Sequence, residues 1–281
     1  PTPASAILSG LVGSEMCIRD SRHTDTYVVK IASGFYDNPS NGLPSSNGMM
    51  LAFSATTGEP VAILRDEGCK IGAIYPTKLF TDEEAVSEIK KFGSMSDNNF
   101  IENVAVSESY AYGAPKTKKK FKIAAVDFGI KENILRIMKD MGGDITVMPP
   151  TTTAKEIAAL KPDGIFLSNG PGDPKVLTSA VEEVKQMMKL EIPIFGICLG
   201  HQIMSLAYDL KIEKMPFGHH GANHPVHDLK NNTVFITSQN HNFAVANIED
   251  RSDVVVTHRS LFDGSIQGIE HNDKPFYSIQ C

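Results

Sequence analysis

The chain has 281 residues, of which 41% are hydrophobic and 21% charged, and its formal net charge is −6 at pH 7. This length suits one large domain or two ordinary ones with a buried core. The acidic balance argues against nucleic acid or an anionic membrane surface as the main partner, and no apolar run approaches the roughly 18–20 residues that cross a bilayer.

The four cysteines are scattered along the chain and form no C-x-x-C pair. They are Cys17, Cys69, Cys198 and Cys281. This usage predicts a reducing, cytoplasmic compartment, and it predicts neither a disulfide framework nor a zinc ribbon.

The first 64 residues fall into two stretches of different character. Residues 1–21 show neither helical nor strand periodicity and resemble a translated sequencing adapter, so we expect disorder or arbitrary structure there. Residues 22–64 contain three strand candidates separated by turn signals, at 26–32, 49–54 and 61–64.

This second stretch resembles a fragment of the ornithine cyclodeaminase/μ-crystallin family. In that family a strand-borne lysine contacts the substrate carboxylate, and Lys30 in Tyr27-Val-Val-Lys30 would correspond to it. The stretch carries no G-x-G-x-x-G fingerprint, so it does not predict a complete oxidoreductase of that kind. The alternative interpretation of Lys30 is an ordinary edge-strand lysine.

Residues 65–120 lead into a more regular region. The stretch Leu64-Arg-Asp-Glu-Gly-Cys-Lys-Ile-Gly-Ala-Ile-Tyr75 resembles the end of the amino-terminal domain of carbamoyl-phosphate synthase small subunits, and we assign residues 65–114 to that domain. Thr81 is the predicted N-cap of a helix over 81–91, which has acidic residues in its first turn and lysines in its last. The basic run 115–120 is interpreted as a linker, with an anion-binding patch as the alternative.

Residues 121–281 alternate between strands and helices. This alternation predicts an α/β fold with an open, mostly parallel sheet flanked by helices on both faces, preceded by a partial, irregular N-terminal region. Ligands in such sheets bind beyond the carboxyl ends of the strands. The predicted strands are 121–127, 144–148, 164–168, 192–197 and 276–280, and the predicted helices are 131–141, 154–160, 179–190 and 200–208.

Two motifs follow predicted strands. Leu167-Ser-Asn-Gly-Pro-Gly-Asp-Pro174 is a stiff loop whose backbone N–H groups can approach a ligand closely, although a plain turn is the alternative. Gly196-Ile-Cys-Leu-Gly-His-Gln202 places Cys198 between a strand and a helix start, as in a nucleophile elbow. The helix dipole there favours the thiolate, and the Leu199 N–H would face a developing oxyanion. A lone cysteine is otherwise a small buried hydrophobe.

Together the two motifs resemble the triad-type, class I glutamine amidotransferases, whose sheet is flavodoxin-like. Three more stretches resemble the carbamoyl-phosphate synthase small-subunit family in particular. They are Met215-Pro-Phe-Gly-His-His-Gly-Ala-Asn-His-Pro-Val226, Ser238-Gln-Asn-His-Asn-Phe-Ala244 and Ser260-Leu-Phe-Asp-Gly-Ser-Ile-Gln-Gly-Ile269.

The resemblance implies a mechanism and a set of site residues. A cysteine thiolate attacks the amide carbon of L-glutamine, ammonia leaves, and water hydrolyses the thioester. Cys198 would be this nucleophile, and the N–H groups of Leu199 and Gly170 would line the oxyanion hole. Asn242 stands where the family usually has glycine, and asparagine adopts a positive φ less readily than glycine. The residues implied to bind glutamine are Gly170, Gly172, Leu199, Gln202, Asn240, Asn242 and Phe243.

The family continues from a strand like 276–280, through one more residue, into His-Pro-Glu. There the histidine is the general base and the glutamate orients it, and this sequence reaches Cys281 one residue before that histidine. We therefore expect a polypeptide of these 281 residues, as a truncated and chimeric copy, to hydrolyse glutamine poorly. His201 and His241 belong to other motifs and are not predicted to be the base.

The resemblance also implies partners and cofactors. The chain would supply ammonia to a carbamoyl-phosphate synthase large subunit, which uses ATP, Mg²⁺ and bicarbonate. No P-loop is present, so no cofactor is predicted in this chain. The cluster His219, His220, His224 and His227 does not follow a helical i, i+4 face, so no metal site is predicted.

Three alternatives remain at this point. One is a non-catalytic module that binds glutamine, which a missing base would favour. Another is the glutaminase of a different amidotransferase, such as that of anthranilate or guanylate synthesis. The third is an ornithine cyclodeaminase-like oxidoreductase, which rests on residues 22–64 alone.

Overall fold

The computed structural model describes residues 17–19, 26–34, 46–54, 60–65, 81–92, 98–113, 120–246, 248 and 251–281. These residues form two units, each of which is described by itself. The first contains residues up to 95 together with 216–224 and 236–242. The second contains residues 96–215, 225–235 and 243–281.

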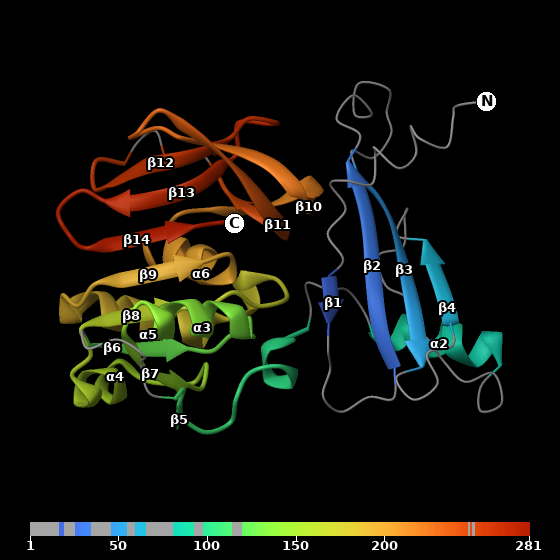
Figure 1. The fold of residues 1–281 in the computed structure, drawn as a ribbon, viewed down its shortest axis with the longest axis horizontal. Coiled ribbons are helices and arrows are strands. Elements are labelled where there is room, and N and C mark those ends of the chain that lie inside the picture. Colours follow the sequence, from blue (N-terminus) through green and yellow to red (C-terminus); the bar gives the residue numbers. More distant parts are fainter. Residues whose placement is uncertain are drawn as a thin grey trace. The chain divides into compact units, whose positions relative to one another are not determined.

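The first unit contains a four-stranded antiparallel sheet with the order β1-β2-β3-β4 (Figure 1). The three strands predicted between residues 26 and 64 are confirmed. The stretch Cys17–Arg19, for which no strand was predicted, pairs with β2, with Cys17 opposite Lys30. The strands are β1 (Cys17–Arg19), β2 (Thr26–Gly34), β3 (Ser46–Ser54) and β4 (Pro60–Arg65).

The helix predicted after Thr81 is confirmed as α2 (Asp82–Phe92). Thr81 Oγ1 accepts a hydrogen bond from the Glu84 N–H at 3.2 Å, and Glu84 Oε2 accepts one from the Thr81 N–H at 2.8 Å. This reciprocal capping satisfies two N–H groups that a helix start leaves without partners. The predicted linker at 115–120 lies outside the described residues except for Lys120, as do most of residues 1–21 and the stretch 66–80.

The second unit is built on a sheet with the order β11-β10-β12-β13-β14-β9-β8-β6-β7-β5 (Figure 1). All pairings from β14 through β9, β8 and β6 to β7 are parallel, as predicted. The strands are β5 (Tyr110–Ala111), β6 (Phe121–Val126), β7 (Gly143–Met148), β8 (Gly164–Leu167), β9 (Ile194–Ile197), β10 (Ile212–Asp228), β11 (Thr233–Val245), β12 (Val254–Ser260), β13 (Ile266–His271) and β14 (Phe276–Ile279).

The predicted helices between these strands are confirmed, with ends shifted by at most three residues. The longest predicted helix, over 179–190, ends as a regular α-helix at Met187 and continues as one 3₁₀ turn. The helices are α3 (Glu132–Asp140), α4 (Ala154–Leu160), α5 (Thr178–Met187) and α6 (Leu199–Ala207), and the 3₁₀ turns are Ile101–Asn103, Pro174–Val176 and Met188–Leu190.

An antiparallel extension beyond β14 differs from the predicted elements. Strands β12 and β13 pair antiparallel, and the long strand β10 runs through Pro216, Gly218, Gly221 and Pro225. Proline and glycine disfavour strand interiors, so local preference did not indicate a strand there. Long-range pairing overrides that preference, for example where Val226 of β10 lies opposite Ser260.

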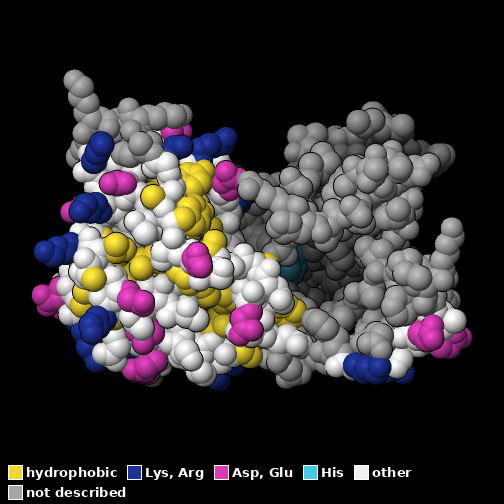
Figure 2. All heavy atoms as spheres, turned by 90° about the horizontal axis from the view of Figure 1, so that it is seen from below, with side chains coloured by type: hydrophobic (Ala, Val, Ile, Leu, Met, Phe, Trp, Pro, Cys, Tyr) yellow, Lys and Arg dark blue, Asp and Glu magenta, His cyan; other side chains and the backbone are white. Residues whose placement is uncertain are grey.

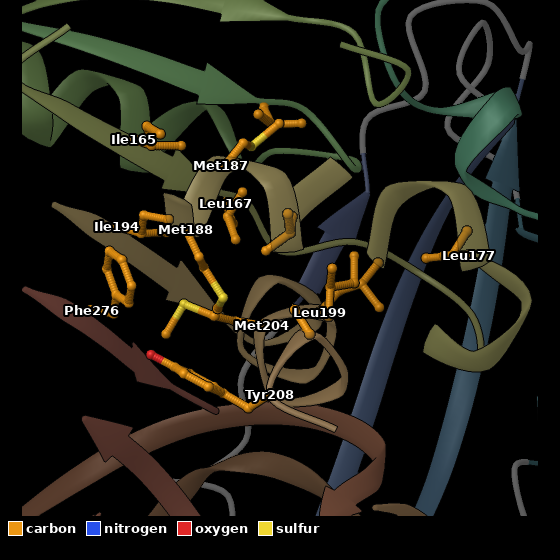
Figure 3. Packing of buried hydrophobic residues seen from close by; sticks show 14 of the residues in the cluster. Ile165, Leu167, Leu177, Met187, Met188, Ile194, Leu199, Met204, Tyr208 and Phe276 are labelled. Carbon is orange, nitrogen blue, oxygen red and sulfur yellow. The ribbon is translucent and has the colours of Figure 1, made fainter. Parts of the chain in front are cut away.

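The two faces of the parallel strands pack against different helices. In β6, Ala124 and Val126 join a core with Ile157 of α4, Met187 of α5 and Ile203 of α6, whereas Ile123 and Ala125 pack on the other face with Leu135 of α3. This period-2 alternation follows from the pleat of a strand. Figure 3 shows part of the larger core, with Met187 and Met188 near Leu167 and Ile194, and Met204 near Tyr208.

The parallel register aligns the carboxyl ends of four strands. Val126 lies opposite Leu167, Leu167 opposite Gly196, and Gly196 opposite Ser278. The residues that follow β6, β8, β9 and β14 therefore meet at one edge of the sheet, where ligands of open α/β sheets bind.

On the face shown in Figure 2, acidic and basic side chains of the described residues are interspersed around hydrophobic ones. The described residues of this face therefore form no large field of a single sign. Among the described residues, no helix has both the length and the apolar composition needed to cross a membrane.

Candidate active site

Cys198 occupies a sharp turn between β9 and α6. Its backbone has φ 53° and ψ −104°, a conformation that costs a non-glycine residue about 1–3 kcal/mol. Two hydrogen bonds hold it there: the Cys198 N–H donates to Ile279 O at 2.9 Å, and Cys198 O accepts from the Gln202 N–H at 3.0 Å. The predicted elbow is therefore present, and strain is concentrated at the residue that carries the thiol.

Glycines at both ends of the turn allow the strand and helix to approach closely. A Cβ added to Gly196 would lie 2.8 Å from Gly200 C and O. A Cβ on Gly200 would lie 2.2 Å from Leu167 O in the neighbouring strand β8. Real Cβ atoms do not come this close, so the elbow requires glycine at both positions.

The loop after β8 packs directly against the elbow. A Cβ on Gly170 would lie 2.1 Å from Phe128 O and 2.7 Å from Leu199 Cδ2. Gly172 has φ +98°, which favours glycine. The Gly200 N–H donates to Ser168 O at 3.0 Å, joining loop and helix start. The two motifs that the sequence singled out are thus in contact.

Three polar residues that were not predicted as site residues hold this loop and the neighbouring turn after β6 in place. Ser168 Oγ accepts from the Phe128 N–H at 2.8 Å, and Asn169 Nδ2 donates to Gly129 O at 3.0 Å. Asp127, only 2% exposed, accepts from the Gly129 and Ile130 N–H groups, each at 2.7 Å. A single acidic residue at the carboxyl end of the apolar predicted strand 121–127 was the sequence signal that could have indicated this role.

Gln202, on the first turn of α6, joins three segments of the second unit. Its Nε2 donates both to Phe243 O and to Gln280 Oε1, each at 3.0 Å. Gln202 and Gln280 are 3% and 1% exposed. The predicted site residues Gln202 and Phe243 are therefore in direct contact, and Gln280 is an additional member that the sequence motifs did not identify.

The acidity of Cys198 differs from the prediction. Burial raises the pKa of the Cys198 thiol to about 11, although the backbone N–H of Leu199 and the side chain of Gln280 act to lower it. The Leu199 N–H at the helix start acts in the direction predicted from the sequence, but the loss of hydration outweighs it, so the net pKa is raised. The thiol needs an added base or cation to ionise near neutral pH.

This thiol is expected to react with iodoacetamide slowly at pH 7 and about tenfold faster for each pH unit up to about 11. The reason is that only the thiolate reacts, and about one thiol in 10⁴ is ionised at pH 7. Peptide mass spectrometry after timed alkylation measures the rate at Cys198. A rate that levels off near pH 8.5 would contradict the raised pKa.

His201 lies three residues after the thiol but does not supply that base. It is fully buried, its Nδ1 lies 2.7 Å from Ser278 Oγ, and burial lowers the pKa of its ring to about 3. The ring is neutral at pH 7 and packs α6 against β14. This agrees with the prediction that His201 is not the base.

Asn240 and Asn242 lie in the part of β11 that belongs to the first unit. Asn240 Oδ1 is 2.8 Å from His220 Nδ1, and Asn242 Oδ1 is 3.1 Å from His220 Nε2. Asn242 is not among the residues with positive φ, so it adopts this backbone without the strain considered from the sequence. Binding of glutamine by these two asparagines stays a prediction.

His219 of the predicted cluster and His241 lie beside one glutamine in the first unit, whereas His227 belongs to the second unit, where its Nε2 lies 2.9 Å from Asn232 Oδ1. Gln239 Oε1 is 2.9 Å from His219 Nδ1 and 3.0 Å from His241 Nε2, and the rings of His219 and His224 lie 4.8 Å apart. Within the described part of the chain, no three His, Cys, Asp or Glu side chains are grouped as metal ligands.

Comparison with known proteins shows which family this chain belongs to. The family model of class I glutamine amidotransferases matches residues 124–281. The carbamoyl phosphate synthase small chain of Vibrio parahaemolyticus is 43% identical over 265 residues, which cover 89% of this chain and 70% of the relative. The chain belongs to the carbamoyl phosphate synthase small-chain family of class I glutamine amidotransferases. The resemblance noted in the sequence is confirmed.

Another relative supports the same family, and a solved structure supports the same fold. The small chain of Haemophilus ducreyi is 46% identical over 238 residues, which cover 78% of this chain and 61% of the relative. The chain thus spans about three fifths of that relative's length. A crystal structure from Thermoplasma acidophilum, provisionally assigned to GMP synthase, has a TM-score of 0.51 at 22% identity, over 58% of this chain and 84% of that one. It confirms the predicted fold class.

Proposed function

We propose that this small-chain amidotransferase releases ammonia from L-glutamine through a thioester on Cys198. The Cys198 sulfur attacks the side-chain amide carbon, the C–N bond breaks with ammonia as the protonated leaving group, and water then hydrolyses the thioester to glutamate. The observation that carries this proposal is the strained turn that holds the Cys198 thiol at the sheet edge where ligands bind.

In this proposal the two contacting motifs form the reaction site. The N–H groups of Leu199 and Gly170 stabilise the oxyanion, which is supported by the close packing of Gly170 against Leu199. Gln202 and Phe243, linked by the 3.0 Å hydrogen bond, hold the substrate. The remaining residues proposed to contact glutamine are Gly172, Asn240 and Asn242.

The proposed partner is a carbamoyl phosphate synthase large subunit, which would consume the ammonia with bicarbonate and ATP. The names of the relatives support this assignment, since each is a small chain of that synthase. ATP and Mg²⁺ would act in the large subunit, so no cofactor is assigned to this chain. The scattered cysteines support a cytoplasmic location for the complex.

A glutamine-binding module without turnover is the second candidate, and the thiol chemistry favours it for a polypeptide of these 281 residues. The raised pKa of Cys198 leaves little thiolate at neutral pH, and His201, whose pKa is lowered to about 3, is too weak a base to take the thiol proton. We therefore propose that such a polypeptide binds glutamine but turns over slowly.

A glutamine-derived chloromethyl ketone at pH 9 tests the proposed site. We expect modification of Cys198 that saturates with reagent concentration and is slowed by L-glutamine but not by L-glutamate, because the site binds the amide before the sulfur reacts. Peptide mass spectrometry identifies the modified cysteine. If glutamine gave no protection, or if Cys281 reacted in place of Cys198, the proposed function would be wrong.

A further inference from the structure

The hydrogen bonds around Gln202 determine how the neighbouring glutamine is oriented. Phe243 O can only accept a hydrogen bond, so the Gln202 group that faces it is the amide nitrogen. The same nitrogen donates to Gln280, 78 residues away, so Gln280 presents its oxygen to Gln202. The Gln280 amide nitrogen, Nε2, is thereby turned away from Gln202.

The strand register places Gln280 beside the thiol. Ile279 of β14 lies opposite Ile197 of β9, and the next residues along the two segments are Gln280 and Cys198. The Cys198 N–H donates to Ile279 O at 2.9 Å, and the Gln280 N–H donates to Gln267 O at 2.8 Å. Both backbones are thus fixed at this point, and the Gln280 side chain reaches Gln202 on the first turn of α6.

The remaining donor of Gln280 is available for a ligand or for the sulfur. Gln280 Nε2 is buried and has no hydrogen-bond partner of ordinary geometry among the described residues. Burial, and to a smaller extent the neighbouring Cys281, raise the pKa of Cys198, and the nearby Gln280 side chain acts against this increase. A neutral thiol is a weak acceptor, whereas a thiolate is a strong one, so this contact gains strength when the sulfur ionises.

We propose that Gln280 is a donor to the Cys198 sulfur, and that its amide oxygen at the same time positions Gln202. One side chain would then link the reacting thiolate to the residue proposed to hold glutamine. This inference rests on Cys198 being the reacting group of the proposed function. Its test measures only the ionisation of the Cys198 thiol. The inference about Gln280 can therefore be wrong while the proposed glutamine hydrolysis is right, and the proposed hydrolysis can be wrong while the inference is right.

The test is the alkylation rate of Cys198 in Gln280→Met between pH 8 and pH 10. Methionine has a similar size but no donor, so the thiolate loses a charge-assisted hydrogen bond and its population is expected to fall about tenfold. The remaining thiolate is more basic and therefore a better nucleophile, which offsets about threefold of that loss. The measured alkylation rate is therefore expected to fall about threefold. Trypsin releases Cys198 in the peptide 190–211, which contains no other cysteine, so its rate is read directly.

Two further variants separate this role from general packing. Gln280→Glu keeps an acceptor for Gln202 but replaces the donor by oxygen, so it is also expected to slow alkylation at least threefold. Gln267→Met changes an equally buried glutamine whose Nε2 donates to Ser265 Oγ, and it is expected to leave the rate within about twofold. Loosened packing would expose the thiol and accelerate alkylation, so an unchanged or faster rate in both Gln280 variants would overturn the proposal.

Discussion

A polypeptide of these 281 residues is expected to release ammonia from glutamine about 10³–10⁶ times more slowly than the same chain extended past Cys281 by the carboxyl-terminal segment of the Vibrio parahaemolyticus relative. In the family that segment is implied to begin with His-Pro-Glu. The added histidine would take the proton from a thiol whose pKa is about 11, which His201 cannot do because its own pKa is about 3. A coupled glutamate assay measures both rates.

The matched control is the same extension with glutamine in place of the added histidine. It restores the packing of the added segment without a base, so its rate is expected to stay near that of the 281-residue polypeptide. Equal rates for all three proteins would show that ionisation of Cys198 depends on another group. The control also separates the contribution of proton transfer from that of fold stability.

Gly200→Ala is expected to lower the free energy of unfolding of the amidotransferase unit by about 3 kcal/mol. Helix propensity alone predicts the opposite sign, because alanine is favoured over glycine inside a helix by about 1 kcal/mol. We expect the steric clash to outweigh helix propensity, because the added Cβ would lie 2.2 Å from Leu167 O, a strand carbonyl that cannot move without disturbing the sheet. Urea unfolding followed by far-UV circular dichroism measures the change.

Gly164→Ala is the control for this prediction. The position begins β8, and a Cβ there would lie 3.8 Å from Pro193 O, an ordinary contact. Its effect on the free energy of unfolding is expected to stay within about 0.5 kcal/mol. A stabilised Gly200→Ala protein would mean that the strand and helix separate easily, and the elbow would then not be the rigid turn described above.

Much of the amidotransferase fold could be predicted from local patterns. Strands such as Phe121–Val126 contain buried apolar runs, and helices such as α4 begin at a capping residue, Thr153, whose hydroxyl accepts from the Glu156 N–H. These signals involve residues a few positions apart, so they can be read along the chain. Strand β10 could not be predicted this way, because its prolines and glycines oppose a strand until β12 supplies a partner.

In the candidate site too, some residues could be predicted from local sequence and others could not. Cys198 between a strand and a helix, with Gly196 and Gly200 beside it, was recognisable because the elbow is a local device. The oxyanion hole of Leu199 and Gly170, which the family resemblance implies, stays a prediction, and the structure adds that Gly170 packs closely against Leu199. The carboxylate of Asp127 was missed although its partners Gly129 and Ile130 follow it directly along the chain. The amide of Gln280 was missed because its partner Gln202 is 78 residues away.

The sequence by itself therefore determined the α/β fold class, the position of the thiol and the family of this chain. Only the tertiary structure decided the acidity of that thiol and the neighbours that act on it. The physical reason is that a pKa depends on hydration and on donors brought close by folding. Cys198 and Gln280 are far apart in the chain and meet only because β9 and β14 pair in parallel.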